Sequence, residues 1–220
     1  MRRFFFPPAL ALAAALTVGA QPAAHAMGPF NTGVNASGVP LALDAVDPHY
    51  RIVGSSGFGP AAYAKPSGVP ITNGAWINNS SASTWLVPTP DFFFIDQPGI
   101  TDTIRYVTDF DLSATPAPGW KIDGRWAADD SGLTIKLNGV ALPDLAVAQA
   151  DKWTAFSITS GILPGLNTLE FITFSTVSPT GLRVEMLTTA VPEPSNWLLM
   201  AGGLGVLVLR RLQRHTGERA

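Results

Sequence analysis

Cysteine is absent from all 220 residues. This absence excludes disulfides, a thiol nucleophile and a zinc–thiolate site. Histidine is scarce as well: between residues 27 and 190 the only one is His49, which excludes a multi-histidine metal site in that part of the chain. A Ser-His-Asp hydrolase would have to use this residue. We expect His49 to be a loop histidine rather than a catalytic base.

The usual catalytic motifs are also missing. No G-x-S-x-G nucleophile elbow occurs, because the run from Gly54 ends in Phe58 instead of glycine. No phosphate loop, dinucleotide fingerprint or EF-hand loop is present. Paired carboxylates, which are all that a glycosidase needs, remain in two places, Asp109 with Asp111 and Asp129 with Asp130. We expect both pairs to be solvated charges or turn residues, and we predict no catalytic residues and no enzyme.

Positive charge is in deficit. Residues 27–190 contain 8 Lys and Arg against 14 Asp and Glu, a net charge of −6. Bulk electrostatics of this sign disfavour binding to DNA, RNA or an anionic polysaccharide. We therefore predict no nucleic-acid partner.

What the chain does contain is an apolar segment at each end. The first begins with Met1-Arg2-Arg3, continues as an Ala- and Leu-rich run, and ends in the small-x-small site Ala24-His25-Ala26. This pattern predicts a secretory signal peptide over residues 1–26, cut after Ala26. The alternative is an N-terminal anchor that stays in place. Two early prolines and the cleavage site favour the signal peptide.

The second apolar segment spans residues 197–209, WLLMAGGLGVLVL, and a basic tail, 210–220, follows it. An apolar run closed by arginines is typical of a membrane segment whose basic end stays in the cytoplasm. Thirteen helical residues reach only about 20 Å, whereas a typical span needs about twenty residues. A buried helix and an interfacial helix are the alternatives. Three glycines disfavour the first and the lack of a polar face disfavours the second, so a short transmembrane helix fits best.

The segment 191–220 as a whole resembles the PEP-CTERM sorting signal of exported bacterial proteins. The residues that carry the resemblance are Val191, Pro192, Glu193 and Pro194, the apolar span, and Arg210 with Arg211. The resemblance implies transient anchoring in the inner membrane and recognition of Pro-Glu-Pro by a membrane-embedded exosortase. It further implies removal of the tail and a final location at the cell surface or outside the cell. The secretion machinery and an exosortase are then the expected partners.

Residues 27–190 remain as one ectodomain, best defined over 84–189. No sustained helical period occurs; short alternating runs separated by turn residues predict an all-β, two-sheet sandwich. We expect Leu133, Ile135 and Leu137 to face inward on one strand, which leads into a tight hairpin at Asn138-Gly139. The predicted strands are 50–53, 75–78, 84–87, 92–95, 103–112, 120–126, 133–137, 140–142, 153–158, 168–176 and 181–189. Residues 103–186, with the runs GRWAADDSGLTIKLNG, FSITSGILPGLNTLEF and PTGLRVEM, resemble the jelly-roll domains, galactose-binding-like in outline, that often precede a PEP-CTERM tail.

Two kinds of ligand site are conceivable in this ectodomain. Exposed indole rings can serve as platforms for sugars, and Trp76 and Trp85, beside an Asn/Ser-rich stretch, are the candidate ligand face. Oxygen ligands in loops suit a structural calcium ion, with Asp123, Asp129 and Asp130 as candidate ligands and no other cofactor expected. We therefore expect a non-enzymatic surface or matrix protein associated with extracellular polysaccharide. A carbohydrate-binding module is the first alternative and a glycoside-active enzyme the second.

Overall fold

The computed structural model describes residues 28–54, 58–68, 71–90, 102–112, 119–176 and 179–191. These residues form ten strands and one short 3-10 helix, so the prediction of an all-β domain is confirmed. The elements are β1 Val46–Ile52, β2 Ala61–Lys65, η1 Ile71–Asn73, β3 Trp85–Val87, β4 Asp102–Asp111, β5 Trp120–Asp129, β6 Ser131–Leu137, β7 Val140–Ala141, β8 Thr154–Ile158, β9 Leu166–Ser175 and β10 Gly181–Ala190.

The two terminal segments lie outside these ranges. They include the predicted cleavage site at Ala24 and Ala26, the sorting residues from Pro192 onward, and the span 197–209 with Arg210 and Arg211; the strand expected at 92–95, in the middle of the chain, also lies outside the described residues. Within the described ranges, no helix has the length and apolar character needed to cross a membrane.

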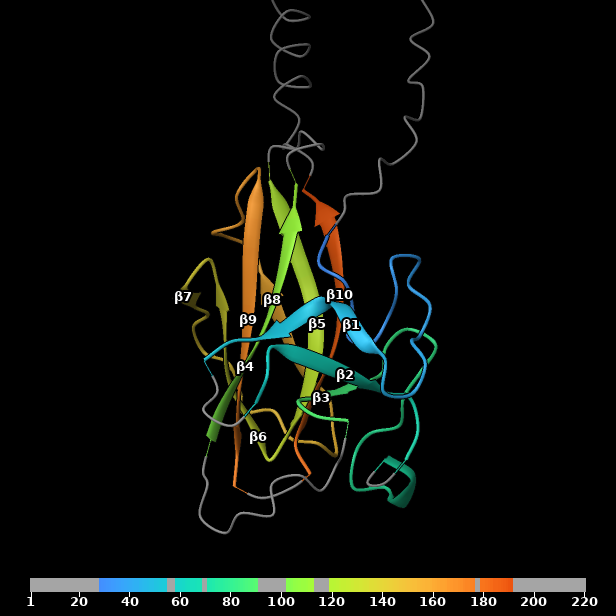
Figure 1. Cartoon of the computed structure of the whole chain (residues 1–220). Coiled ribbons are helices and arrows are strands. Elements are labelled where there is room, and N and C mark those ends of the chain that lie inside the picture. The colour runs from blue at the N-terminus through green and yellow to red at the C-terminus, as the bar shows by residue number, and fades with distance from the viewer. Residues whose placement is uncertain are drawn as a thin grey trace, which may run out of the picture.

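All ten strands belong to one sheet in the order β7-β6-β9-β4-β1-β2-β3-β10-β5-β8, and every pairing is antiparallel. The sheet curls on itself, because β5, near one end of this order, contacts β6 and β9, near the other. Two layers result, with β6, β9 and β4 in one and β3, β10 and β5 in the other. The short strands β1 and β2 run crosswise to the long ones and connect the layers (Figure 1).

The main core lies between these layers. Phe171 of β9 meets the rings of Trp126 from β5 and Phe156 from β8, with centroids 5.9 and 6.0 Å away. Tyr50 of β1 reaches the same ring at 6.4 Å. Along β4, residues 104, 106, 108, 110 and 112 are all buried, as the alternation predicted. Burial of such large rings is the main favourable term for folding.

One inward residue was predicted wrongly. Leu133 is 43% exposed, whereas Ile135 and Leu137 are buried. The pairing of β6 with β9 shifts register between Gly132 and Thr134, and a bulge of this kind turns the side chains that follow to the other face. The bulge lets Gly132 lie under the Trp126 ring, where an added Cβ would be 2.5 Å from Cη2. The hairpin at Asn138-Gly139 is confirmed: both residues have positive φ, 50° and 82°.

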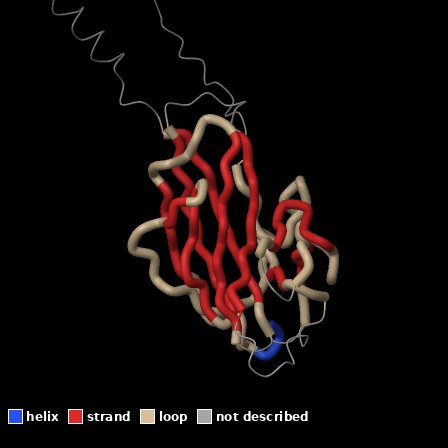
Figure 2. The backbone as a smooth tube through the Cα atoms, turned by 60° about the vertical axis from the view of Figure 1, so that its left-hand side comes forward, coloured by secondary structure: helices blue, strands red, loops and turns tan. Residues whose placement is uncertain are grey.

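A second, smaller core lies on the outer face of the β3–β10–β5 layer. Its buried members are Ile71, Trp76, Trp85, Val87, Ala127 and Ala150. Strand alternation explains the position, because Leu86 and Trp126 point into the main core while Trp85 and Ala127 point the other way. The long strands run side by side in the body of the domain, and η1, which supplies Ile71, lies at one end of it (Figure 2). One outer face of the domain is therefore covered by loops.

Candidate functional site

The predicted ligand face is not exposed. Trp76 is 2% exposed and Trp85 is fully buried, and their rings pack together with centroids 4.2 Å apart. Each indole N–H has an internal acceptor: Trp76 donates to Asp129 Oδ2 at 3.0 Å and Trp85 to the Ile77 carbonyl at 2.9 Å. The expectation of an exposed sugar platform is therefore wrong for these two rings. Through these contacts the two rings attach the loop of residues 74–84, called the covering loop below, to the sheet.

The three candidate calcium ligands do not come together. Asp123 and Asp129 both lie on β5, six residues apart, which is about 20 Å of extended chain. Asp123 pairs with Lys121 at 2.9 Å, and Asp130 accepts from Thr176 N at 2.7 Å and from its Oγ1 at 2.5 Å. Among the described residues, no group of three or more His, Asp or Glu side chains could hold a metal ion.

Asp109 lies on the outer face of β4, whereas Asp129 lies on the outer face of β5. Asp109 alternates with the inward residues of β4 and bonds Arg51 and Thr168, at 2.5 and 2.7 Å. Asp129 points from β5 toward the second core. His49 lies on strand β1 rather than in the expected loop, and its ring stacks on Phe30 with centroids 3.6 Å apart.

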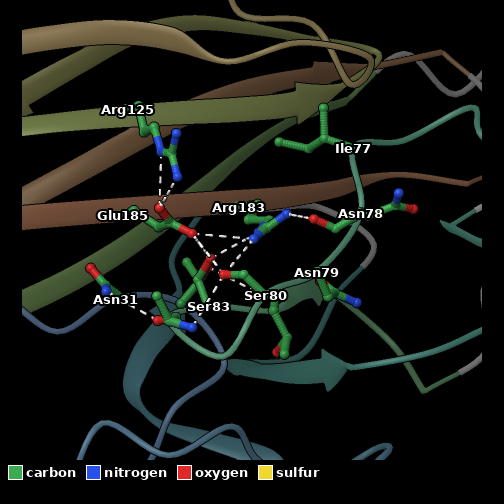
Figure 3. A network of polar contacts seen from close by, with 12 residues as sticks. Asn31, Ile77, Asn78, Asn79, Ser80, Ser83, Arg125, Arg183 and Glu185 are labelled. Atoms are coloured by element: carbon green, nitrogen blue, oxygen red, sulfur yellow. Dashed lines mark hydrogen bonds and ion pairs between the residues drawn. The ribbon is translucent and has the colours of Figure 1, made fainter.

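The structure instead assembles a charged cluster on the outer face of β5 and β10. These strands pair over their full lengths, and the register puts Arg125 directly opposite Glu185. Arg125 Nε and Nη2 donate to Glu185 Oε2 at 2.9 and 2.6 Å. Arg183, two residues before Glu185, shares this face and donates to Glu185 Oε1 at 3.2 Å. Glu185 thus lies between two guanidinium groups (Figure 3).

A polar loop closes over the buried half of this cluster. Arg183 is 1% exposed. Its Nε donates to Ser83 Oγ at 2.8 Å, its Nη2 to Ser80 Oγ at 3.0 Å, and its Nη1 to the Asn78 carbonyl. The hydroxyl groups of Ser80 and Ser83 in turn donate to Glu185 Oε1, at 3.0 and 2.8 Å. Figure 3 shows these groups converging from β10 and the loop. Every nitrogen of the buried guanidinium therefore has an acceptor, as burial of a charge requires.

Trp153 completes the cluster. Its ring centroid lies 4.5 Å from Cζ of Arg125 and 4.7 Å from Cζ of Arg183, within cation–π range. The ring is half-buried, whereas the Arg125 side chain is 50% exposed. The loop that carries Trp153 is tied to the covering loop where Ile77 N donates to the Ala150 carbonyl at 2.8 Å. The exposed part of the cluster is thus an indole beside a guanidinium.

Charges in the cluster are stable at neutral pH. Burial lowers the pKa of Arg183 to about 10, although Glu185 opposes this shift. Burial alone would raise the pKa of Glu185, but hydrogen bonds from Arg125, Ser83 and Ser80 hold it below its usual value. Two positive charges therefore face one negative charge. A carboxylate with a lowered pKa that accepts from four side chains is a structural anion rather than a proton donor.

The alternation of residues along 120–126 and 181–189 puts Arg125 on the polar side of one strand and Arg183 with Glu185 on the polar side of another, but it does not bring the two strands together. The signal that joins them is the register of β5 with β10, two segments about sixty residues apart in the sequence. From the sequence, Trp153 is predicted only as the first residue of the strand at 153–158. Its partners come from strands that the sequence does not place beside it.

A scan against protein-family models and a search of curated proteins each return no match. Among solved structures, the chain is similar to TmCBM61 in complex with β-1,4-galactotriose (8% identity, 64% of this chain and 88% of that one, TM-score 0.38). It is also similar to a family 35 carbohydrate-binding module from Clostridium thermocellum (11%, 64% and 92%, TM-score 0.34). A third is the tailspike protein 4 enzymatically active domain of bacteriophage CBA120 (11%, 66% and 20%, TM-score 0.36). Likenesses at this level establish neither a family nor a ligand for this chain.

Proposed function

We propose that the protein is an exported, non-enzymatic surface or extracellular-matrix component. In this proposal a jelly-roll, galactose-binding-like ectodomain is carried by a signal peptide and a PEP-CTERM sorting tail. The observation that carries the proposal is the order of features at the C-terminus: Pro-Glu-Pro at 192–194, an apolar span, and then arginines. The secretion machinery and an exosortase would act on the two ends, and extracellular polysaccharide would surround the product.

The position of the ends of the ectodomain supports this reading. Gly28 packs against Thr188, so closely that an added Cβ would lie 2.7 Å from the threonine Cβ. Val191 N donates to the Gly119 carbonyl at 3.0 Å, close to the start of β5. Both terminal segments therefore join the domain on the same side. Two apolar segments that leave from one side can enter a single membrane without distorting the domain between them.

The test is cell fractionation followed by mass spectrometry of the protein in each fraction. We expect a chain that begins at Met27 in membrane and extracellular fractions, with a tail-free form outside the inner membrane. Changing Pro192 and Pro194 to Ala should cause the tail-bearing form to accumulate, whereas changing Pro164 and Pro179 should not. Intact protein in the cytosol, with residues 1–26 still present, would overturn the proposal.

A second candidate function is carbohydrate binding, and the Trp153–Arg125 surface favours it. A half-buried indole beside a hydrogen-bonding side chain is a common way to hold a sugar ring, because the ring's C–H face is apolar and its hydroxyls are polar. A glycan array probed with the detergent-solubilised full chain tests this candidate. Binding that Trp153→Ala abolishes would support it, and an array without any bound glycan would exclude it.

A further inference from the structure

We propose that the outer face of β5 carries a binding site for a carboxylate-bearing sugar, such as a hexuronate unit of an acidic polysaccharide, at Arg125 and Trp153. The inference rests on the carbohydrate-binding candidate and specifies its site and ligand class. Three observations carry it: the fixed orientation of Arg125, the indole against it, and the local charge.

Arg125 is held in place rather than free to move. Two of its donors are directed to Glu185 Oε2, and Glu185 is itself fixed through Oε1 by Ser80, Ser83 and Arg183. Within the described part of the chain, Arg125 Nη1 donates no hydrogen bond, and half of the side chain is exposed. A guanidinium that is oriented before the ligand arrives loses less entropy on binding.

Trp153 supplies the apolar part of the surface. Its contact with both guanidinium groups fixes the ring plane, and the ring retains partial exposure. Asn78 and Ser80, whose loop borders the cluster, are exposed polar residues. A pyranose ring presents an apolar face, hydroxyl groups and, in a uronate, one carboxylate. The surface offers a matching group for each of these.

Charge decides between a neutral and an acidic sugar. The cluster has two arginines and one glutamate, hence one surplus positive charge, in an ectodomain whose net charge is −6. The neighbouring Lys121–Asp123 pair is neutral. The surplus positive charge therefore attracts an anion to this surface. A ligand carboxylate that accepts from Arg125 Nη1 would form a charge-assisted hydrogen bond. Because the rest of the domain repels anions, binding should be weak and sensitive to salt.

The test compares oligogalacturonate with its fully methyl-esterified form, which keeps the sugar and removes the charge. Titration calorimetry on the detergent-solubilised full chain should show at least about tenfold weaker binding of the ester. Arg125→Gln should abolish this preference, Arg125→Lys should retain part of it, and Trp153→Phe should bind better than Trp153→Ala.

Arg51→Gln is the matched control. Arg51 is 47% exposed, lies on β1, and pairs with Asp109 of the other layer, as Arg125 pairs with Glu185. This variant removes the same charge and should leave affinity within about twofold. Equal losses of affinity in Arg51→Gln and Arg125→Gln would show that bulk electrostatics cause the binding, and would overturn the proposed site. Binding of neutral glycans alone would contradict the proposal of an acidic ligand but not that of carbohydrate binding. The absence of binding to any glycan would contradict both proposals. Neither result bears on export.

Discussion

Arg183 and Arg125 make similar ion pairs with the same carboxylate, yet they differ in what they do for stability. The Arg183 side chain is 2% exposed and that of Arg125 is 50% exposed. A buried guanidinium has lost its water and depends on every partner that it has. An exposed one exchanges protein partners for solvent at little cost. The same chemical group is therefore structural in one place and available for binding in the other.

This difference can be measured by urea denaturation of two variants. Arg183→Met should lower the free energy of unfolding by about 3–5 kcal/mol, because it leaves the two serine hydroxyls and the Asn78 carbonyl without their buried partner. Arg125→Gln should lower it by about 0–1 kcal/mol. Equal losses in the two variants would show that the covering loop does not bury the cluster in solution.

Asp129 should make the stability of the folded protein depend on pH in a direction that can be predicted. Burial raises its pKa to about 6 from 3.8, with a further rise from Asp130, although the Trp76 N–H opposes the shift. The folded state thus holds the proton more tightly than the unfolded one. The resulting stability is fully present below about pH 4 and is lost as pH rises through about 6.

Asp129→Asn should therefore stabilise the protein at pH 7.5 by about 1–2 kcal/mol, after allowance for partial exposure, and should have little effect at pH 4. Its amide oxygen can still accept from Trp76. Asp123→Asn is the control with the opposite sign. Hydrogen bonds from Lys121 and Ser157 lower the pKa of Asp123, so this variant should lose stability at neutral pH, and the loss should fade only as the pH falls below about 4. Thermal melts at both pH values distinguish the two, and a pH-independent effect at Asp129 would contradict the prediction.

Residues beside Trp76 and Trp85 show why exposure was misjudged from sequence. An Asn/Ser-rich stretch ordinarily indicates a solvated loop. Here Asn79 Oδ1 accepts from Trp85 N at 2.9 Å, and the two serines bond Arg183 and Glu185, about one hundred residues away. The stretch is polar because it covers a buried ion pair. Nothing local in the sequence distinguishes that role from exposure to water.

At the scale of elements, local alternation was enough to predict most long strands but not their neighbours. The inward faces of β4 and β5 can be predicted from the alternation of apolar and polar residues along each strand. The Asn138-Gly139 turn fixes the β6–β7 hairpin. The expected strand at 75–78 does not form; those residues belong to the covering loop. The sheet order depends on pairings between distant segments, such as β4 with β9, and on the bulge at Gly132, which no periodicity encodes.

The pairing of β5 with β8 and β10 depends on the small size of Gly124. An added Cβ there would lie 2.7 Å from Phe156 Cε1 and 2.9 Å from the Glu185 carbonyl oxygen. Since the ring is part of the core, it cannot move freely. Gly124→Ala should lower the free energy of unfolding by about 1–3 kcal/mol. Gly165→Ala, where nothing lies within 4 Å, should change it by less than about 0.5 kcal/mol. Urea denaturation of both provides the comparison, and no difference between them would contradict the close packing at Gly124.

At the scale of the whole molecule, the first described residues are hydrogen-bonded to the last strand, β10. Asn31 Oδ1 accepts from Met186 N at 2.7 Å, and Thr32 N donates to the Val184 carbonyl at 3.1 Å. These bonds occupy the edge of β10 beyond its short contact with β3, which pairs only at Leu182. The start of the ectodomain thus extends the sheet next to its end. The two ends of the described domain are brought together by the fold itself.

Neighbouring ends predict that the ectodomain tolerates circular permutation. Gly28 lies against Thr188, three residues before Val191, so a linker of about six residues can join 191 to 28. New ends between Gly139 and Val140 open only the exposed hairpin at the sheet edge. This permutant should unfold cooperatively and keep the near-ultraviolet circular dichroism of unpermuted residues 28–191. A second permutant opened between Phe171 and Ile172, in the buried centre of β9, should not fold. Failure of the first permutant, with residues 28–191 folding normally, would mean that the two ends are not neighbours in solution.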